Sequence, residues 1–131
     1  MINLRNFFIN VFRISRCGHC KRLKPEYAKA AEMLLGNDPP ITLAKVDCTE
    51  SGKEICNKYS INGYPTLKIY SRGDFVGDYN GPREAAGIAK YMKVIRILIM
   101  QKLFNHFTYL ISIYPRHKLV QHLKNYKKKV I

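Results

Sequence analysis

Residues 17–27 read CGHCKRLKPEY, and this run holds the most informative pattern in the sequence. Two cysteines separated by two residues, as Cys17 and Cys20 are, can form a disulfide only if the first lies at the start of a helix and the second lies one turn inside it. At a helix start, a sulfur faces unpaired N–H groups and the positive end of the helix dipole, which lower its pKa. Cys17 is therefore the predicted nucleophile, and the more enclosed Cys20 is the predicted resolving thiol, which keeps its proton until it attacks a mixed disulfide.

The two residues between the cysteines, Gly18 and His19, influence how strongly the disulfide attracts electrons. A protonated His19 stabilises the Cys17 thiolate, which favours the reduced dithiol and makes the disulfide a stronger oxidant. We therefore predict that Gly18 and His19 tune the redox chemistry of the two cysteines.

Two other uses of a Cys-x-x-Cys pair fit this sequence poorly. A zinc site needs a second pair of ligands, but the remaining cysteines, Cys48 and Cys56, have seven residues between them and form no second knuckle. A c-type haem site needs a histidine directly after the second cysteine, where Lys21 stands. We predict no metal and no cofactor.

Three segments together resemble a known family. They read CGHCKRLKPEYAKAAEMLL, LAKVDCTESGKEICNKYSINGYPTLKIY and YNGPREAAGI, and they lie in this order within residues 17–93. This part of the chain resembles a catalytic thioredoxin-like domain of the protein disulfide isomerase family, most of all the member that assists glycoprotein folding alongside calnexin and calreticulin. The resemblance implies an α/β fold with a mixed sheet flanked by helices.

The resemblance also implies an activity. Members of this family carry out thiol–disulfide exchange on unfolded or misoxidised proteins in the endoplasmic reticulum lumen, with glutathione as a redox partner. Reduction potentials run from about −270 mV for thioredoxin to about −180 mV for protein disulfide isomerase, a gap of about 4 kcal/mol for two electrons. On this scale, His19 indicates oxidation and isomerisation of substrates rather than their reduction.

Several further residues take expected roles from the resemblance. The lysine matching Lys45 is buried with a glutamate and shuttles protons to the resolving cysteine, and the arginine matching Arg83 favours the thiolate of that cysteine. The bond before the proline matching Pro65 is cis, and the backbone of Tyr64 is left to bind an extended substrate. Cys48 and Cys56 are expected to form a structural disulfide, which residue spacing alone leaves open.

The pattern of apolar residues predicts the elements around these positions. A buried central strand near the start of the chain leads to Cys17, and a helix over 20–35 presents an apolar face. Pro82 is expected at the first turn of a final helix, with Arg83 just inside it. The remaining expected elements are a strand over 41–46, a helix that ends near residue 59, and strands over 67–70 and 75–77 joined by a turn.

The sequence departs from the family before the first cysteine. Relatives carry Ala-Pro-Trp there, whereas this chain carries Ile14-Ser15-Arg16, and Val11 occupies the place of the buried glutamate. The usual first strand and helix are lacking as well. We therefore expect a family module that is shortened at its front, with its activity impaired there. We expect neither a signal peptide nor a terminal Lys-Asp-Glu-Leu sequence in this chain, which is then either an incomplete product or targeted differently.

The net charge of +14 is concentrated outside the resembling part. Residues 17–84 hold ten Lys or Arg and all nine acids, whereas residues 85–131 hold ten Lys or Arg and no acid. We predict a thioredoxin-like domain over 1–93, followed by an amphipathic helix and basic tail over 94–131. Arg96 and Lys102 argue against a membrane-spanning helix, because each buried cation costs about 2.5–3.5 kcal/mol.

The basic tail leaves a second function open. It fits either a solvated end or a weak contact with an anionic surface, and no specific nucleic acid is predicted as a target. The alternative to an enzyme is therefore a non-catalytic interaction fragment that acts on membranes or other partners through residues 94–131.

Overall fold

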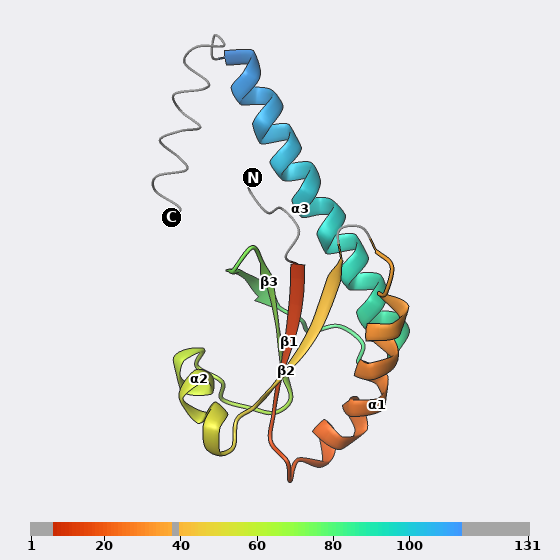
Figure 1. The fold of residues 1–131 in the computed structure, drawn as a ribbon, viewed down its shortest axis with the longest axis vertical. Coiled ribbons are helices and arrows are strands. Elements are labelled where there is room, and N and C mark those ends of the chain that lie inside the picture. The colour runs from red at the N-terminus through yellow and green to blue at the C-terminus, as the bar shows by residue number, and fades with distance from the viewer. Residues whose placement is uncertain (1–6, 38–39, 114–131) are drawn as a thin grey trace. The chain divides into compact units, whose positions relative to one another are not determined.

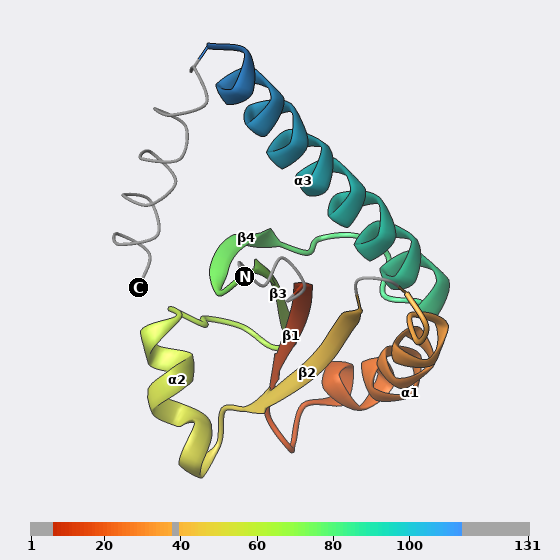
Figure 2. The same cartoon turned by 45° about the horizontal axis from the view of Figure 1, so that its top comes forward.

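The structure, a computed structural model, describes residues 7–37 and 40–113. Its core is a four-stranded mixed sheet with the strand order β2-β1-β3-β4, in which β1 and β2 are parallel and the other pairs are antiparallel. The elements in chain order are β1 (Phe7–Arg13), α1 (Gly18–Met33), β2 (Ile41–Asp47), a 3₁₀ turn (Glu50–Gly52), α2 (Lys53–Lys58), β3 (Thr66–Ser71), β4 (Asp74–Asp78) and α3 (Ala85–Ile113). Figures 1 and 2 show α1 and α2 on opposite sides of this sheet.

The first strand, β1, is the central strand that the apolar run predicted. It is paired on both sides, with β2 and with β3, and its residues Ile9 and Phe12 are fully buried. Successive side chains of a strand point to opposite faces, so Ile9 and Phe12 anchor the two faces of the sheet separately. The prediction of a buried strand that leads to Cys17 is confirmed.

The helix after the cysteines, α1, is fastened to the sheet through one tyrosine. Leu23, Tyr27 and Ala30 recur at helical spacing and are buried. The hydroxyl group of Tyr27 donates at 2.7 Å to the carbonyl oxygen of Ile9 in β1 and lies 2.9 Å from that of Ala44 in β2. Because one side chain contacts two strands, the middle of α1 is held at a fixed place beside the sheet.

The strands β3 and β4 form the predicted hairpin. At its turn, Arg72 and Gly73 both have positive φ, 56° and 92°, as a tight two-residue hairpin turn requires. Glycine adopts this backbone without strain, whereas Arg72 does so at some cost. The turn lies at the opposite end of the sheet from Cys17, because Ser71 pairs with Phe7 at the start of β1.

The last helix, α3, begins later than the sequence predicted. Pro82 and Arg83 precede the helix, which starts at Ala85. The reason is a tertiary contact, in which a carboxylate oxygen of Glu26 in α1 accepts a hydrogen bond from the Ala85 N–H group at 2.9 Å. This bond gives a partner to an N–H group that the first turn of a helix leaves unpaired.

The chain divides into two compact units, Met1–Lys93 and Val94–Ile131. Helix α3 contributes to both units, and the predicted basic tail after Pro115 lies outside the described residues. Among the residues that the structure describes, no helix is long and apolar enough to cross a membrane.

Candidate active site

The two cysteines of the CGHC run lie at the start of α1, as their spacing predicted. Cys17 is the residue that caps the helix, with an extended backbone (φ −83°, ψ 117°), and its sulfur accepts the Cys20 N–H group at 3.2 Å. Both thiols are free, with Cys17 half-buried and Cys20 buried at 6% exposure. The more accessible sulfur is therefore also the one that receives a helix N–H group.

The two thiols differ in acidity for identifiable reasons. Hydrogen bonding to the Cys20 side chain lowers the pKa of Cys17 most, and the backbone N–H groups of Cys20 and His19 and the charge of Arg22 lower it further against the effect of partial burial. Burial raises the pKa of Cys20, and hydrogen bonding to Cys17 raises it as well. These directions make Cys17 the thiol that ionises first.

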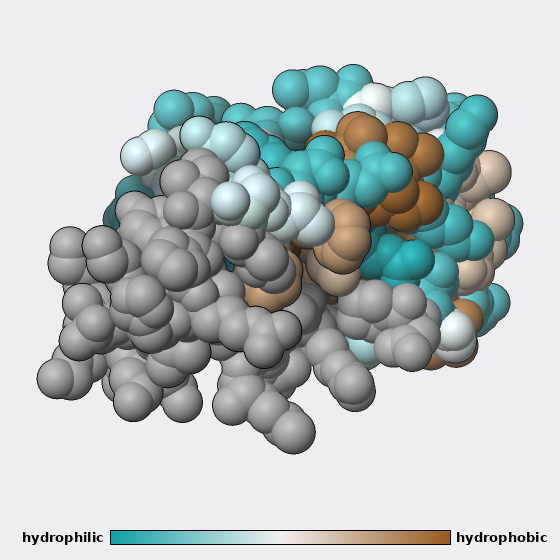
Figure 3. All heavy atoms as spheres, turned by 90° about the horizontal axis from the view of Figure 1, so that it is seen from above, coloured by the Kyte–Doolittle hydropathy of each residue, from teal (hydrophilic) through white to brown (hydrophobic). Residues whose placement is uncertain are grey.

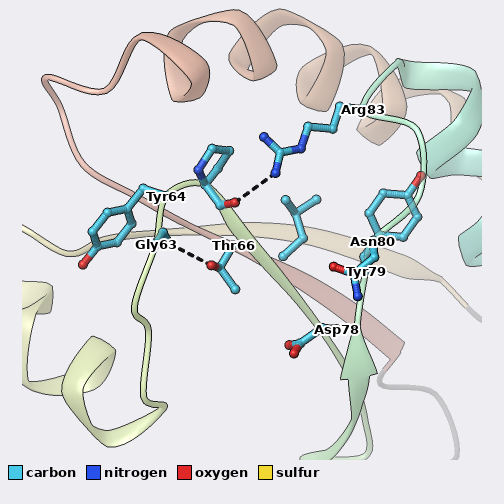
Figure 4. Close-up of a pocket in the computed structure, with 9 residues that line it drawn as sticks. Gly63, Tyr64, Thr66, Asp78, Tyr79, Asn80 and Arg83 are labelled. Carbon is cyan, nitrogen blue, oxygen red and sulfur yellow. Dashed lines mark hydrogen bonds between the residues drawn. The ribbon is translucent and has the colours of Figure 1, made fainter.

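The loop before β3 faces Cys17. The Tyr64–Pro65 peptide bond is cis, and the Cys17 thiol donates to the carbonyl oxygen of Tyr64 at 3.7 Å. A guanidinium nitrogen of Arg83 donates to the carbonyl oxygen of Pro65 at 3.4 Å, as Figure 4 shows. The fold thus brings the Cys17 sulfur to the backbone of Tyr64, 47 positions later in the chain.

A pocket opens beside this loop. Its volume is about 380 Å³, and Figure 4 shows its lining side chains around the start of β3 and the end of β4. The lining residues are Gly63, Tyr64, Pro65, Thr66, Leu67, Asp78, Tyr79, Asn80 and Arg83. Tyr64 and Pro65, the predicted substrate-binding residues, therefore line this pocket. No pattern in the sequence indicated that β4 would contribute to it as well.

His19 has a partner that the sequence analysis missed. A guanidinium nitrogen of Arg22 lies 2.7 Å from the Nδ1 atom of His19, and both side chains are exposed. Residues three apart on a helix are neighbours, so the spacing of His19 and Arg22 was the available signal.

The expectation of a buried Lys45 is wrong. Lys45 is exposed, although it pairs in register with Val11, which is buried at 5% exposure. The reason is topological, because β2 is an edge strand among the described residues and a long lysine side chain there reaches solvent. Burial raises the pKa of Cys20, and the charge of Arg13 acts in the opposite direction. A guanidinium nitrogen of Arg13 also pairs with a carboxylate oxygen of Asp47 at 3.2 Å.

The other two cysteines, Cys48 and Cys56, are joined in a disulfide with a Cα–Cα distance of 5.7 Å. They are buried against Phe12, on the face of the sheet opposite Ile9. This bridge lies at the end of β2 and inside α2, so it connects the sheet to that helix. Among the described residues, no group of three or more His, Cys, Asp or Glu side chains is placed to hold a metal ion.

Comparison with known proteins identifies the family. Residues 4–94 match the thioredoxin family. The chain is 53% identical over 76 residues to the probable protein disulfide-isomerase ER-60 of Schistosoma mansoni, covering 58% of this chain and 16% of the relative. It is 48% identical over 94 residues to protein disulfide isomerase-like 1-1 of Arabidopsis thaliana, covering 70% of this chain and 19% of the relative. The chain thus spans less than a fifth of the length of these relatives.

Solved structures agree with the sequence comparison. The first thioredoxin domain of mouse protein disulfide-isomerase A4 matches with a TM-score of 0.62 and 39% identity, covering 70% of this chain and 64% of that one. The crystal structure of human ERp44 matches with a TM-score of 0.66 and 25% identity, covering 72% of this chain and 29% of that one. The chain therefore belongs to the thioredoxin family, and its thioredoxin-like domain is of the protein disulfide isomerase type.

Proposed function

We propose that this chain catalyses thiol–disulfide exchange on unfolded or misoxidised proteins through Cys17 and Cys20. The observation that carries the proposal is the position of the Cys17 sulfur, which caps α1, accepts a helix N–H group and faces the loop that contains Pro65. The proposed compartment is the lumen of the endoplasmic reticulum, where oxidising conditions let disulfides persist. Glutathione is the proposed small redox partner.

The reaction follows from the difference between the two thiols. The Cys17 thiolate attacks one sulfur of a substrate disulfide, forming a mixed disulfide and releasing the other substrate sulfur as a thiolate. Cys20 then loses its proton and attacks the Cys17 sulfur, which forms the Cys17–Cys20 disulfide and releases the second substrate thiolate. The substrate has gained two electrons and the protein has lost two. The reverse sequence oxidises a substrate dithiol.

The remaining site residues have supporting roles in this proposal. Gly18 and His19 tune the stability of the Cys17 thiolate, while Arg83 acts on the loop through the Pro65 carbonyl group. Tyr64 and Pro65 present backbone to an extended segment of the substrate, since proline has no N–H group to pair within the sheet.

The test is reactivation of a protein whose disulfides have been scrambled, in glutathione buffer. The wild type should restore activity, Cys17→Ser should abolish the effect, and Cys20→Ser should accumulate a mixed disulfide with the substrate because resolution is blocked. Ser15→Ala provides a neighbouring control outside the thiol pair. Equal reactivation by the wild type and Cys17→Ser would reject the proposal.

We propose a second, weaker property for residues 94–113, which is contact with an anionic membrane surface. Ile97, Met100, Phe104 and Phe107 recur at helical spacing in α3 and are 49%, 37%, 67% and 46% exposed. Apolar side chains also reach the surface on the face drawn in Figure 3, among hydrophilic ones. Residues 85–131 contain ten Lys or Arg and no acid, so an anionic surface attracts this segment, whereas a second positively charged copy repels it.

Sedimentation with lipid vesicles tests this contact. The chain should bind vesicles that contain phosphatidylserine more than vesicles of phosphatidylcholine alone, and Phe104→Ser with Phe107→Ser should reduce binding. Tyr109→Ser, an exposed position on another side of α3, is the matched control. Self-association that disappears in the Phe104/Phe107 variant without any vesicle binding would replace this proposal with a dimer contact.

A further inference from the structure

Exposed cations surround Cys17. Arg16 precedes it directly, and Lys21, Arg22 and Lys24 follow within the first two turns of α1, all exposed. No acidic residue occurs between Ile14 and Pro25. In the part of the chain that the structure describes, the ion pairs include none of these four side chains. Residues 14–25, which contain the proposed nucleophile, therefore carry four positive charges and no negative one.

Among these cations, Arg22 is held in place by a contact with another side chain. Its guanidinium group is held at 2.7 Å from His19 Nδ1, and its charge contributes to the low pKa of Cys17. It also lines a hollow of about 220 Å³ together with His19, Leu23, Glu26, Arg83 and Glu84. A hollow of this size accommodates one side chain of a substrate.

The two carboxylates in the lining of the hollow differ in their partners. Glu26 already accepts the Ala85 N–H group at 2.9 Å and pairs with Lys29 at 3.2 Å. Glu84 also lines the hollow, but the ion pairs of the described residues join it to neither guanidinium group. The lining thus carries two guanidinium groups and two carboxylates, one of which is already bound, and the positive excess comes from Lys29 and from the exposed cations that flank Cys17 in the chain.

We propose that this surface selects disulfide substrates that carry an acidic residue next to the cysteine, and that Arg22 is the side chain that contacts this residue. The inference rests on the proposed exchange reaction and adds a substrate preference to it. An acidic neighbour would otherwise repel the approaching Cys17 thiolate, and the surrounding cations offset this repulsion. Because the charges are exposed, each should change the rate by about twofold to fivefold, less at high salt.

The experiment uses three disulfide-linked peptides that are identical except for a Glu, Gln or Lys beside the cysteine. The second-order rate constant for the first attack by the reduced chain is measured at pH 7, in low and in high salt. We expect the order Glu, Gln, Lys from fastest to slowest, with the differences shrinking as salt is added. The rate ratio of the Glu to the Gln peptide is the key quantity, since it cancels any general change in the reactivity of Cys17.

Two variants with the same change of charge then locate the effect. Arg22→Gln should lower the Glu-to-Gln ratio toward one. Arg72→Gln removes an exposed arginine at the opposite end of the sheet and should leave the ratio unchanged. A ratio of one in the wild type, or an unchanged ratio in Arg22→Gln, overturns the inference. If no peptide reacts, the proposed exchange function itself has failed, which is a different result.

Discussion

At the scale of single residues, the site depends on an unequal pair of thiols. Cys17 and Cys20 are three positions apart, yet one sulfur caps the helix and the other is buried. Hydrogen bonds to the sulfur stabilise the charged form of the first, and loss of water destabilises the charged form of the second. The proposed division of labour between nucleophile and resolving thiol thus follows mainly from the positions of the two sulfurs.

This difference predicts the pH dependence of alkylation. An ordinary thiol has a pKa of about 8.5. The rate at Cys17 should reach half of its maximum at a lower pH than the rate at Cys20, because the pKa of Cys17 is lowered from that of an ordinary thiol and the pKa of Cys20 is raised. Iodoacetamide labelling of the reduced chain from pH 5 to 10, followed by peptide mapping, measures both profiles. Coincident profiles would contradict the assignment.

At the scale of elements, two connections fix helices to the rest of the domain. The first is Glu26, through which α1 supplies the cap of α3. The pKa of Glu26 is lowered mainly by the hydrogen bond from Ala85 and further by Lys29. The carboxylate therefore stabilises the fold above the pKa of an unfolded glutamate, about 4.3, and this contribution disappears as the pH falls through the lower folded value.

Glu26→Gln should accordingly be less stable than the wild type at pH 7, and the difference should shrink as the pH falls below about 4. Urea unfolding at a series of pH values measures this. Glu32→Gln, an exposed glutamate in the same helix, is the control and should change little. A difference that stays constant down to pH 3 would show that the charge of Glu26 is not responsible.

The second connection is the Cys48–Cys56 disulfide, which closes a loop with a sequence separation of eight. Replacing both cysteines by alanine should lower the free energy of unfolding by about 2–4 kcal/mol, because the unfolded chain regains conformational freedom. Urea unfolding under non-reducing conditions measures the loss, and peptide mapping shows whether the bridge forms in glutathione buffer. With reductant present, the wild type should fall toward the level of the variant.

At the scale of the whole molecule, we expect the thioredoxin-like domain to fold and to act without the basic segment. Ile88, Ala89 and Met92 of α3 are at most 1% exposed, whereas from Lys93 to Tyr109 every residue is half-buried or exposed. The apolar face that α3 adds to the first unit is therefore complete before residue 94.

A chain shortened to residues 1–93 should retain thiol–disulfide exchange and lose any binding to anionic vesicles. A chain shortened to residues 1–87 lacks Ile88, Ala89 and Met92 and should fail to fold, because these residues fill the core. Circular dichroism and peptide exchange rates of the two fragments measure both outcomes. Loss of exchange in the 1–93 fragment would contradict the predicted domain boundary.

Local patterns in the sequence determined the type and order of the elements. The spacing of Cys17 and Cys20 predicted a helix start, and the alternation or helical spacing of apolar residues predicted the strands and α1, because these signals act between residues close in the chain. Resemblance to a family supplied the cis bond before Pro65 and the expectation of a disulfide. Neither required knowledge of which distant segments meet.

Tertiary structure decided the features that depend on distant segments. Lys45 is exposed because its strand lies at an edge, and α3 starts at Ala85 because Glu26, 59 positions earlier, caps it. Arg83 meets the Pro65 carbonyl group only after two loops have been folded together. Such contacts join residues that are far apart in the chain, and they leave no repeating pattern in the sequence. Only the packed fold therefore determines which charged groups remain in solvent and which groups meet around Cys17.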